Sequence, residues 1–281
     1  MSKYEPEGYW QQRLSGDFSL VGVGSFSLGI GYNQWLYKAR ARTLTRLLKK
    51  NQIKAQGQRV LDIGVGSGFY LDYWKKQGTK SITGIDITQK SVSTLAIKYP
   101  EYQFIKADIS AAELPLNETF DIITAFDVLF HIVEEDKFEQ AIRNIRRLSH
   151  PQTKVLIMDS FLKNMLPADF HQNYRTLERY QGVLKEAGIE MVELAPIFYF
   201  MSAPIDRAAV KSPFCRRLLP YVWTGILRGL GLGNRLLSFS RRTDFAIGHV
   251  LGFLFYLIDG TILKYSQDGP SEKVLFARIK E

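Results

Sequence analysis

The segment 60–70 reads VLDIGVGSGFY and holds the residues best suited to binding a nucleotide-like ligand. Asp62 ends a short apolar run, and Gly64, Gly66 and Gly68 follow at alternate positions before an amphipathic run begins. Glycines in such a turn let the backbone bend sharply, approach a ligand and start a helix close to a sheet. Two other glycine-rich segments follow no predicted strand, so only this one has the strand–turn–helix context of a nucleotide-binding turn. A plain connecting turn without a ligand is the alternative interpretation.

Three further predicted strands also end in an acid. Asp86 closes the run SITGID, Asp108 follows YQFIKA, and Asp127 follows FDIITAF. Because the carboxyl ends of parallel strands meet along one edge of a sheet, these carboxylates are expected around a single crevice. Asp86 is suited to binding two ribose hydroxyls. Taken alone, Asp86 or Asp108 would also fit an ordinary solvated loop.

His131 lies four residues after Asp127 and is expected on the rim of the same crevice. The unperturbed pKa of histidine lies near neutrality, which suits removal of a proton from a hydroxyl group. His131 is therefore the candidate catalytic base, and a packing or hydrogen-bonding role is the alternative. The four histidines form no metal-binding spacing, and the single cysteine, Cys215, excludes a thiolate zinc cluster and an internal disulfide, so no metal site is expected.

The chain that positions these residues has 281 residues, of which 46% are hydrophobic and 23% charged, as in a globular protein. From Arg59 onward, short runs rich in Val and Ile alternate with amphipathic runs, which predicts βαβ units and a doubly wound, Rossmann-like α/β sheet. The predicted strands cover 59–64, 81–87, 102–108, 120–128, 154–159, 191–200 and 273–280. The predicted helices cover 33–50, 69–77, 88–99, 136–148 and 173–187.

The turn D-x-G-x-G-x-G and the acids at successive strand ends resemble the class I S-adenosylmethionine-dependent methyltransferase family. The resemblance runs from about Arg59 to Phe200 and resumes at the last strand. It implies methyltransferase activity, S-adenosylmethionine as cofactor, and a seven-stranded sheet that is mostly parallel with an antiparallel last strand.

The resemblance also implies roles for individual residues. Gly64 and Gly66 would lie against the methionine part of the cofactor, near Asp62. Asp86 would bind both ribose hydroxyls, with Ile87 against the adenine.

The later strand ends complete this implied site. Asp108 would meet the adenine amino group, with the Ile109 amide beside the ring. Phe126 and Asp127 would sit where the fourth strand reaches the methyl donor, with Asp127 facing the acceptor. The cofactor-binding residues implied in this way are Asp62, Gly64, Gly66, Gly68, Asp86, Ile87, Asp108, Ile109 and Phe126.

Residues 1–57 are expected to form an N-terminal lid and helix. Four glycines in 19–31 precede an aromatic, helical segment that contains Tyr32 and Trp35. A glycine-rich entry followed by aromatics is typical of a lid that closes over a ligand, so Tyr32 and Trp35 are candidate acceptor-binding residues. The equally weighted alternative is that these aromatics anchor a surface helix.

Residues 202–270 form a long insertion between the last two predicted strands of a methyltransferase core that covers 58–201 and 271–281. Seven basic residues and no acid occur from Lys211 to Arg242, so of the formal net charge of +9 only 9 − 7 = +2 belongs to the rest of the chain. The apolar run 245–258 predicts a helix that Asp259 and Gly260 end, and it is shorter than the roughly 20 residues of a spanning helix. Three interpretations compete: a cap over an apolar or lipid-like acceptor, a membrane-surface or homo-oligomer contact, or additional core.

Together these patterns predict O-methylation of a small acceptor that is hydrophobic or linked to a lipid or glycan. N- or C-methylation of a natural-product intermediate is the alternative, and a non-catalytic cofactor-binding or membrane-associated assembly protein is the alternative from another class. A nucleic-acid acceptor is not expected, because the fourth strand ends in AFDV and the basic stretch interleaves its arginines with Leu and Gly more than with exposed stacking aromatics. The N-terminus has no secretory pattern, so the expected location is the cytoplasm or the membrane periphery.

Overall fold

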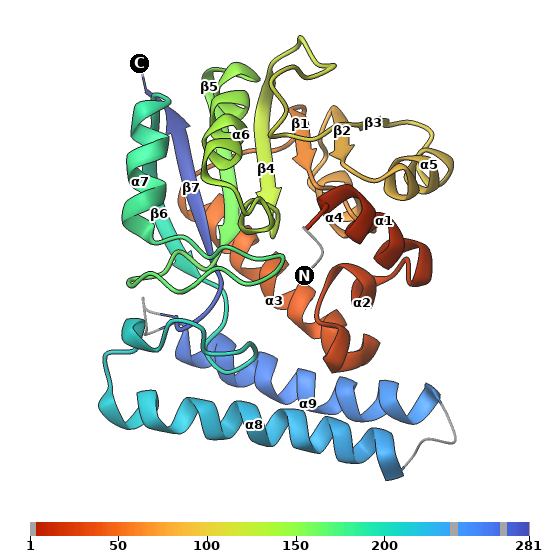
Figure 1. The fold of residues 1–281 in the computed structure, drawn as a ribbon, viewed down its shortest axis with the longest axis vertical. Helices are drawn as coiled ribbons and strands as arrows, with labels where there is room; N and C mark the ends of the chain where they lie inside the picture. The colour runs from red at the N-terminus through yellow and green to blue at the C-terminus, as the bar shows by residue number, and fades with distance from the viewer. Residues whose placement is uncertain (1–3, 237–240, 265–268, 281) are drawn as a thin grey trace.

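The computed structural model describes residues 4–236, 241–264 and 269–280. Seven strands form one sheet in the order β3-β2-β1-β4-β5-β7-β6 (Figure 1). Neighbouring strands from β3 to β5 are parallel, and β7 runs antiparallel to both β5 and β6. The strands are β1 (Arg59–Ile63), β2 (Ser81–Asp86), β3 (Gln103–Lys106), β4 (Phe120–Phe126), β5 (Ser149–Asp159), β6 (Ile189–Pro196) and β7 (Lys273–Ile279). The predicted Rossmann-like fold with an antiparallel last strand is confirmed.

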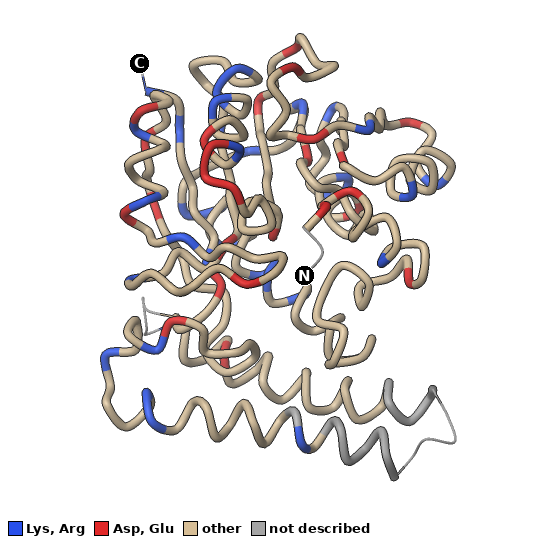
Figure 2. The backbone as a smooth tube through the Cα atoms, in the orientation of Figure 1, with Lys and Arg blue, Asp and Glu red and all other residues tan. Residues whose placement is uncertain are grey.

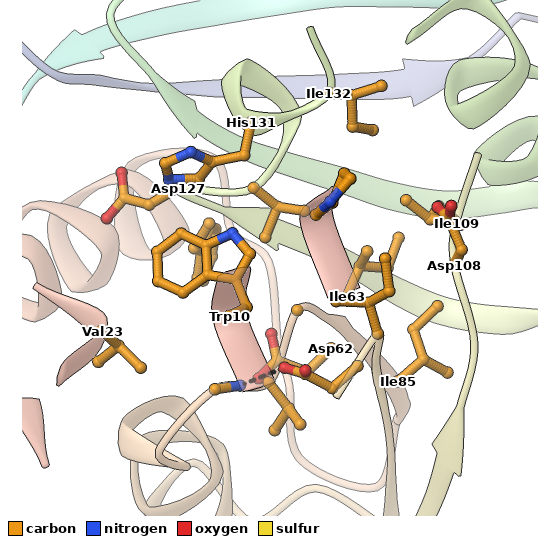
Figure 3. A pocket seen from close by; sticks show the side chains of 18 of the residues that line it. Trp10, Val23, Asp62, Ile63, Ile85, Asp108, Ile109, Asp127, His131 and Ile132 are labelled. Carbon is orange, nitrogen blue, oxygen red and sulfur yellow. Dashed lines mark hydrogen bonds between the residues drawn. The ribbon is translucent and has the colours of Figure 1, made fainter. Parts of the chain in front are cut away.

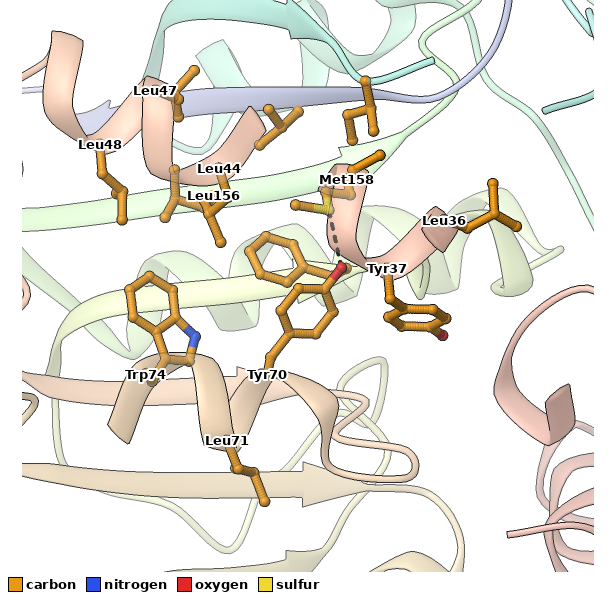
Figure 4. Packing of buried hydrophobic residues seen from close by; sticks show 14 of the residues in the cluster. Leu36, Tyr37, Leu44, Leu47, Leu48, Tyr70, Leu71, Trp74, Leu156 and Met158 are labelled. Carbon is orange, nitrogen blue, oxygen red and sulfur yellow. Dashed lines mark hydrogen bonds between the residues drawn. The ribbon is translucent and has the colours of Figure 1, made fainter. Parts of the chain in front are cut away.

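Helices cover both faces of the sheet because alternate residues of each strand point to opposite sides. On one face, Val60, Ile122 and Leu156 pack with the apolar sides of α3 and α4 (Figure 4). On the other face, Ile123 and Val155 pack against α6 and α7. These layers comprise α3 (Gly29–Lys50), α4 (Phe69–Lys76), α5 (Gln89–Lys98), α6 (Glu135–Arg147) and α7 (Leu177–Glu186).

Two predicted helix boundaries were wrong by four residues. The helix α3 begins at Gly29 rather than at residue 33, and the Asn33 side chain donates to the Gly29 carbonyl at 2.7 Å. The helix α7 begins at Leu177 rather than at residue 173, because the Thr176 hydroxyl caps it by accepting from the Arg179 amide.

The segment 202–270 contains two helices, α8 (Pro213–Leu236) and α9 (Arg241–Ile262), which run side by side along one edge of the molecule (Figure 1). The helix α9 packs closely on α3, since a Cβ at Gly252 would lie 2.8 Å from Trp35 Cδ1 and one at Gly248 would lie 3.0 Å from the Tyr32 amide nitrogen. In the described ranges, no helix combines the length and apolarity needed to cross a membrane. The side chains of Arg235, Arg241 and Arg242, part of the predicted basic stretch, lie outside what is described.

The predicted end of the last apolar run at Ile258 was also wrong, since α9 continues to Ile262. Asp259 sits inside the helix and is fully buried. Its carboxylate accepts hydrogen bonds from the backbone amides of Tyr199, Phe200 and Met201 at 2.9, 2.8 and 3.2 Å. Burial raises the pKa of Asp259 to about 6, against the lowering effect of these hydrogen bonds. Asp259 therefore fastens α9 to the chain that follows β6.

Replacing this carboxylate should loosen the helix. Asp259→Ala removes the acceptor of three backbone amides, so we expect the free energy of unfolding to fall by about 3 kcal/mol. Urea denaturation followed by circular dichroism measures the change. Glu118→Ala, which removes an exposed loop carboxylate, is the control and should change it by less than about 0.5 kcal/mol. Equal stability of Asp259→Ala and wild type would contradict this role.

Candidate active site

A cavity of about 1160 Å³, which includes its open mouth, lies at the carboxyl edge of β1, β2 and β4 (Figure 3). The predicted site residues lie together there, with the exception of Gly68, Tyr32 and Trp35. Its walls include Asp62, Gly64, Gly66, Asp86, Ile87, Asp108, Ile109, Phe126, Asp127 and His131.

The glycine turn after β1 adopts a backbone that other residues rarely reach. Gly64, Gly66 and Gly68 have φ values of 70°, 53° and 85°. A Cβ at Gly64 would lie 2.3 Å from Val128 Cγ2, and one at Gly68 would lie 2.7 Å from Leu95 Cδ2. The turn therefore requires glycine for both conformation and space, although Gly68 does not line the cavity.

Asp86 forms the floor of the cavity at the end of β2. One carboxylate oxygen accepts from the Gly66 amide at 2.9 Å, and the other accepts from the Thr88 amide and hydroxyl at 2.9 and 2.7 Å. Burial raises the pKa of Asp86, and these hydrogen bonds lower it. Because the oxygen that binds the Gly66 amide accepts only that one hydrogen bond, it has a second lone pair that can accept from a ligand's hydroxyl group.

Asp62 lies beside this floor and is fixed by a neighbouring strand. The Thr124 hydroxyl on β4 donates to its carboxylate at 2.6 Å. Burial raises the pKa of Asp62 to about 7. Its side chain therefore changes charge close to neutral pH.

The loop after β3 presents Asp108 and Ile109 to the cavity. One Asp108 carboxylate oxygen accepts from the Ser110 amide and hydroxyl at 2.8 and 2.7 Å. The buried Asn144 side chain on α6 donates to the carbonyls of Ile109 and Ala111, both at 2.8 Å. Asn144 thus fixes the loop that faces the adenine in the family, and sequence analysis missed it because it lies within an ordinary amphipathic helix.

Asp127 follows β4 with a left-handed backbone (φ 59°) and belongs to a buried ion cluster. Arg40 on α3 binds both carboxylate oxygens of Glu272 at 2.7 Å and lies 2.9 Å from Asp127 Oδ2. We call Arg40, Asp127 and Glu272 the Arg40 cluster. Burial raises the pKa of Asp127; Arg40 opposes this effect, while Glu272 and Asp159 add to it.

His131 lies on the cavity wall in the short helix η2 (Leu129–His131). Its Nδ1 lies 2.9 Å from the His171 carbonyl oxygen, which can only accept, so Nδ1 carries a hydrogen and Nε2 has the lone pair. Burial lowers the pKa of His131 to about 3. The ring is therefore neutral at physiological pH, and the Trp10 ring packs against it with centroids 4.8 Å apart.

The N-terminal segment covers the cavity, but through residues other than those expected. Trp10 and Leu14 on α1 (Pro6–Gly16) and Val23 on α2 (Leu20–Val23) line it, and Trp10 lies beside His131 and Asp127 in Figure 3. The sequence pattern did not predict these residues, because α1 and α2 are short and Val23 lies among the glycines of 19–31.

Tyr32 and Trp35 lie outside the cavity, contrary to the prediction that they bind the acceptor. Tyr32 is fully buried and its hydroxyl donates to the Met201 carbonyl at 3.0 Å. Trp35 packs on α9, with its ring 5.1 Å from that of Phe253. Both residues point along the α3–α9 interface, so their aromatic rings anchor helices.

Comparison with known proteins places this geometry in a family. Residues 61–157 match the family model of a methyltransferase domain. Ubiquinone biosynthesis O-methyltransferase of Paracidovorax citrulli is 31% identical over 91 residues, which are 31% of this chain and 38% of that protein. O-methyltransferase rstn1 of Aspergillus nomiae is 26% identical over 171 residues, which are 55% of this chain and 74% of that protein. The chain thus spans less than half of the first relative's length and most of the second's.

A solved structure supports the fold. The crystal structure of the 4+2 cyclase SpnF matches with a TM-score of 0.50 and 19% identity, over 85% of this chain and 80% of that one. Residues 61–157 are therefore a methyltransferase domain. The predicted family, enzyme class and cofactor are confirmed at the level of this domain.

The assignment of Asp86 to the cofactor can be tested by binding. Asp86→Ala removes the carboxylate on the cavity floor, so we expect the affinity for S-adenosylhomocysteine to fall about tenfold to hundredfold. Isothermal titration calorimetry measures this change, and Asp136→Ala, which removes an exposed carboxylate on α6, is the matched control. Unchanged affinity of Asp86→Ala for S-adenosylhomocysteine would show that Asp86 does not bind the cofactor.

Proposed function

We propose that this protein transfers the methyl group of S-adenosylmethionine to an oxygen atom of a small, apolar acceptor. The observation that carries the proposal is Asp127, a carboxylate of raised pKa that faces the cavity at the strand end where the family places the methyl donor.

The residues on the cavity walls fit the cofactor. S-adenosylmethionine supplies a methyl group that is activated by a positively charged sulfur. Asp86 would hold the ribose, the loop of Asp108 and Ile109 would hold the adenine, and Gly64 would leave room for the methionine part. Trp10 packs over the opposite side and excludes water, which favours group transfer over side reactions.

The end of the cavity near Asp127 is aromatic and fits an apolar acceptor. Tyr37, Tyr70 and Phe126 line it, and the rings of Tyr70 and Phe126 lie 4.5 Å apart. Helix α1 covers the cavity, which disfavours a macromolecular substrate such as a nucleic acid. The two relatives named above are O-methyltransferases, which supports oxygen as the methyl acceptor.

N-methylation is the second candidate. The Asp127 carboxylate on the cavity wall would also attract an amine, and a relative from Arabidopsis thaliana, phosphoethanolamine N-methyltransferase 3, is 28% identical over 149 residues. Transfer of a labelled methyl group to matched apolar phenols and amines distinguishes the two. Product from phenols alone supports O-methylation, whereas product from amines alone would overturn it.

We assign the acceptance of the hydroxyl proton to Asp127. A carboxylate whose pKa is raised toward neutrality is a stronger base than an ordinary one, whereas His131 is weakened as a base by its low pKa. His131 stays the alternative proton acceptor through Nε2. Because Asp127 acts in its ionised form, activity should rise with pH through its raised pKa rather than level off near pH 5.

The assignment predicts different effects of two substitutions. Asp127→Asn should lower kcat at least about a hundredfold and abolish this rise with pH, whereas His131→Gln should lower kcat less than about tenfold and keep it. Binding of S-adenosylhomocysteine should be retained in both variants, which shows that the site is intact. A large loss of kcat in His131→Gln together with a mild loss of kcat in Asp127→Asn would assign the acceptance of the proton to His131 instead.

A further inference from the structure

The helix α9 carries a continuous apolar face that the rest of the described chain leaves open. Val250, Phe253, Leu254, Leu257 and Ile258 are exposed by 58, 41, 49, 49 and 43%, and Phe253, at the edge of this face, also contacts the Trp35 ring. Their spacing of three and four residues places them on one side of the helix. The opposite side, with Gly248 and Gly252, is the one that packs on α3.

The neighbouring helix α8 has a second exposed stripe that combines apolar and basic residues. Phe214, Leu218 and Tyr221 are exposed by 73, 37 and 77%. Arg217 and Arg228 are also exposed, and their positions in the helix place them along the border of this stripe. We call these eight apolar residues and two arginines the hairpin face.

Among the described side chains of the two helices, the positive charge on this face has no exposed acidic counterpart. Among the side chains that the structure describes on α8 and α9, the only acidic one is Asp259, which is buried (Figure 2). Monomeric proteins rarely expose contiguous apolar patches of this kind unless another surface covers them. The covering surface must therefore be apolar and negatively charged at its edge.

We propose that the hairpin face lies on an anionic lipid bilayer, with its apolar residues in the headgroup and acyl boundary and its arginines on the lipid phosphates. An apolar helix face bordered by arginines is suited to lying in the plane of a membrane. A second copy of the chain fits less well, because a two-fold contact through this face would place like charges near one another. The proposal does not depend on methyl transfer, although an apolar acceptor would gather in the same bilayer.

Vesicle co-sedimentation tests the proposal with the full chain. We expect the wild type to sediment with phosphatidylcholine vesicles that contain about 30 mol% phosphatidylglycerol. It should bind vesicles of phosphatidylcholine alone much more weakly, and added salt should release part of the bound protein from the anionic vesicles. Two double variants should each lower the partition coefficient at least about tenfold. One combines Leu254→Gln with Leu257→Gln, and the other combines Arg217→Glu with Arg228→Glu.

Matched controls lie on α4 and α5, far along the chain from the hairpin. Ile97→Gln replaces an apolar residue that is 83% exposed, and the pair Lys76→Glu and Lys98→Glu reverses two exposed charges on α4 and α5. The proposal is overturned if the wild type stays in the supernatant with anionic vesicles at low salt, or if the controls lose as much binding as the hairpin variants. A dimer in sedimentation velocity that Leu254→Gln and Leu257→Gln dissociate would assign the face to a second copy instead.

Discussion

The buried contact of Arg40 with Glu272 and Asp127 is the constraint on which the rest of the structure depends. It joins α3, the start of β7 and the end of β4, which are far apart in the chain. Burying three charges is costly, and the cost is offset here because the guanidinium binds Glu272 with two parallel hydrogen bonds. The same contact holds Asp127 in its left-handed conformation at the wall of the cavity.

The helix α3, which carries Arg40, contacts both the cavity and the helix α9. Leu44 and Leu47 pack its second half into the core beside the sheet, and Tyr37 reaches the cavity near Asp127. Its first half receives α9 through the close approach at Gly248 and Gly252. The candidate active site and the hairpin face are therefore both connected to one helix, which sets the orientation of the hairpin face relative to the cavity.

The parts of the site that follow from local sequence could be predicted. A glycine turn and an acid at each strand end lie within a few residues of their own strand, so Asp62, Asp86 and Asp108 reach the crevice through the parallel topology alone. Arg40 and Glu272 are 232 positions apart, and no local spacing relates them.

The helical pattern showed which residues of α3 are apolar but not what they contact. For that reason the sequence leaves two roles open for Trp35, acceptor binding and anchoring of a helix, and the structure shows it packed on α9. Trp10 was missed because short terminal helices have too little periodicity to reveal what they cover. Asp259 illustrates the same limit, since an acid within an apolar helix indicates a break in the helix until its distant partners are known.

The most direct test of the account is a crystal structure of the protein with S-adenosylhomocysteine. The account predicts the ribose hydroxyls on the Asp86 carboxylate, the adenine beside Ile109, and the sulfur at the end of the cavity that Asp127 and Phe126 line. A ligand bound elsewhere, or in the cavity with its sulfur turned away from Asp127, would contradict the central claim.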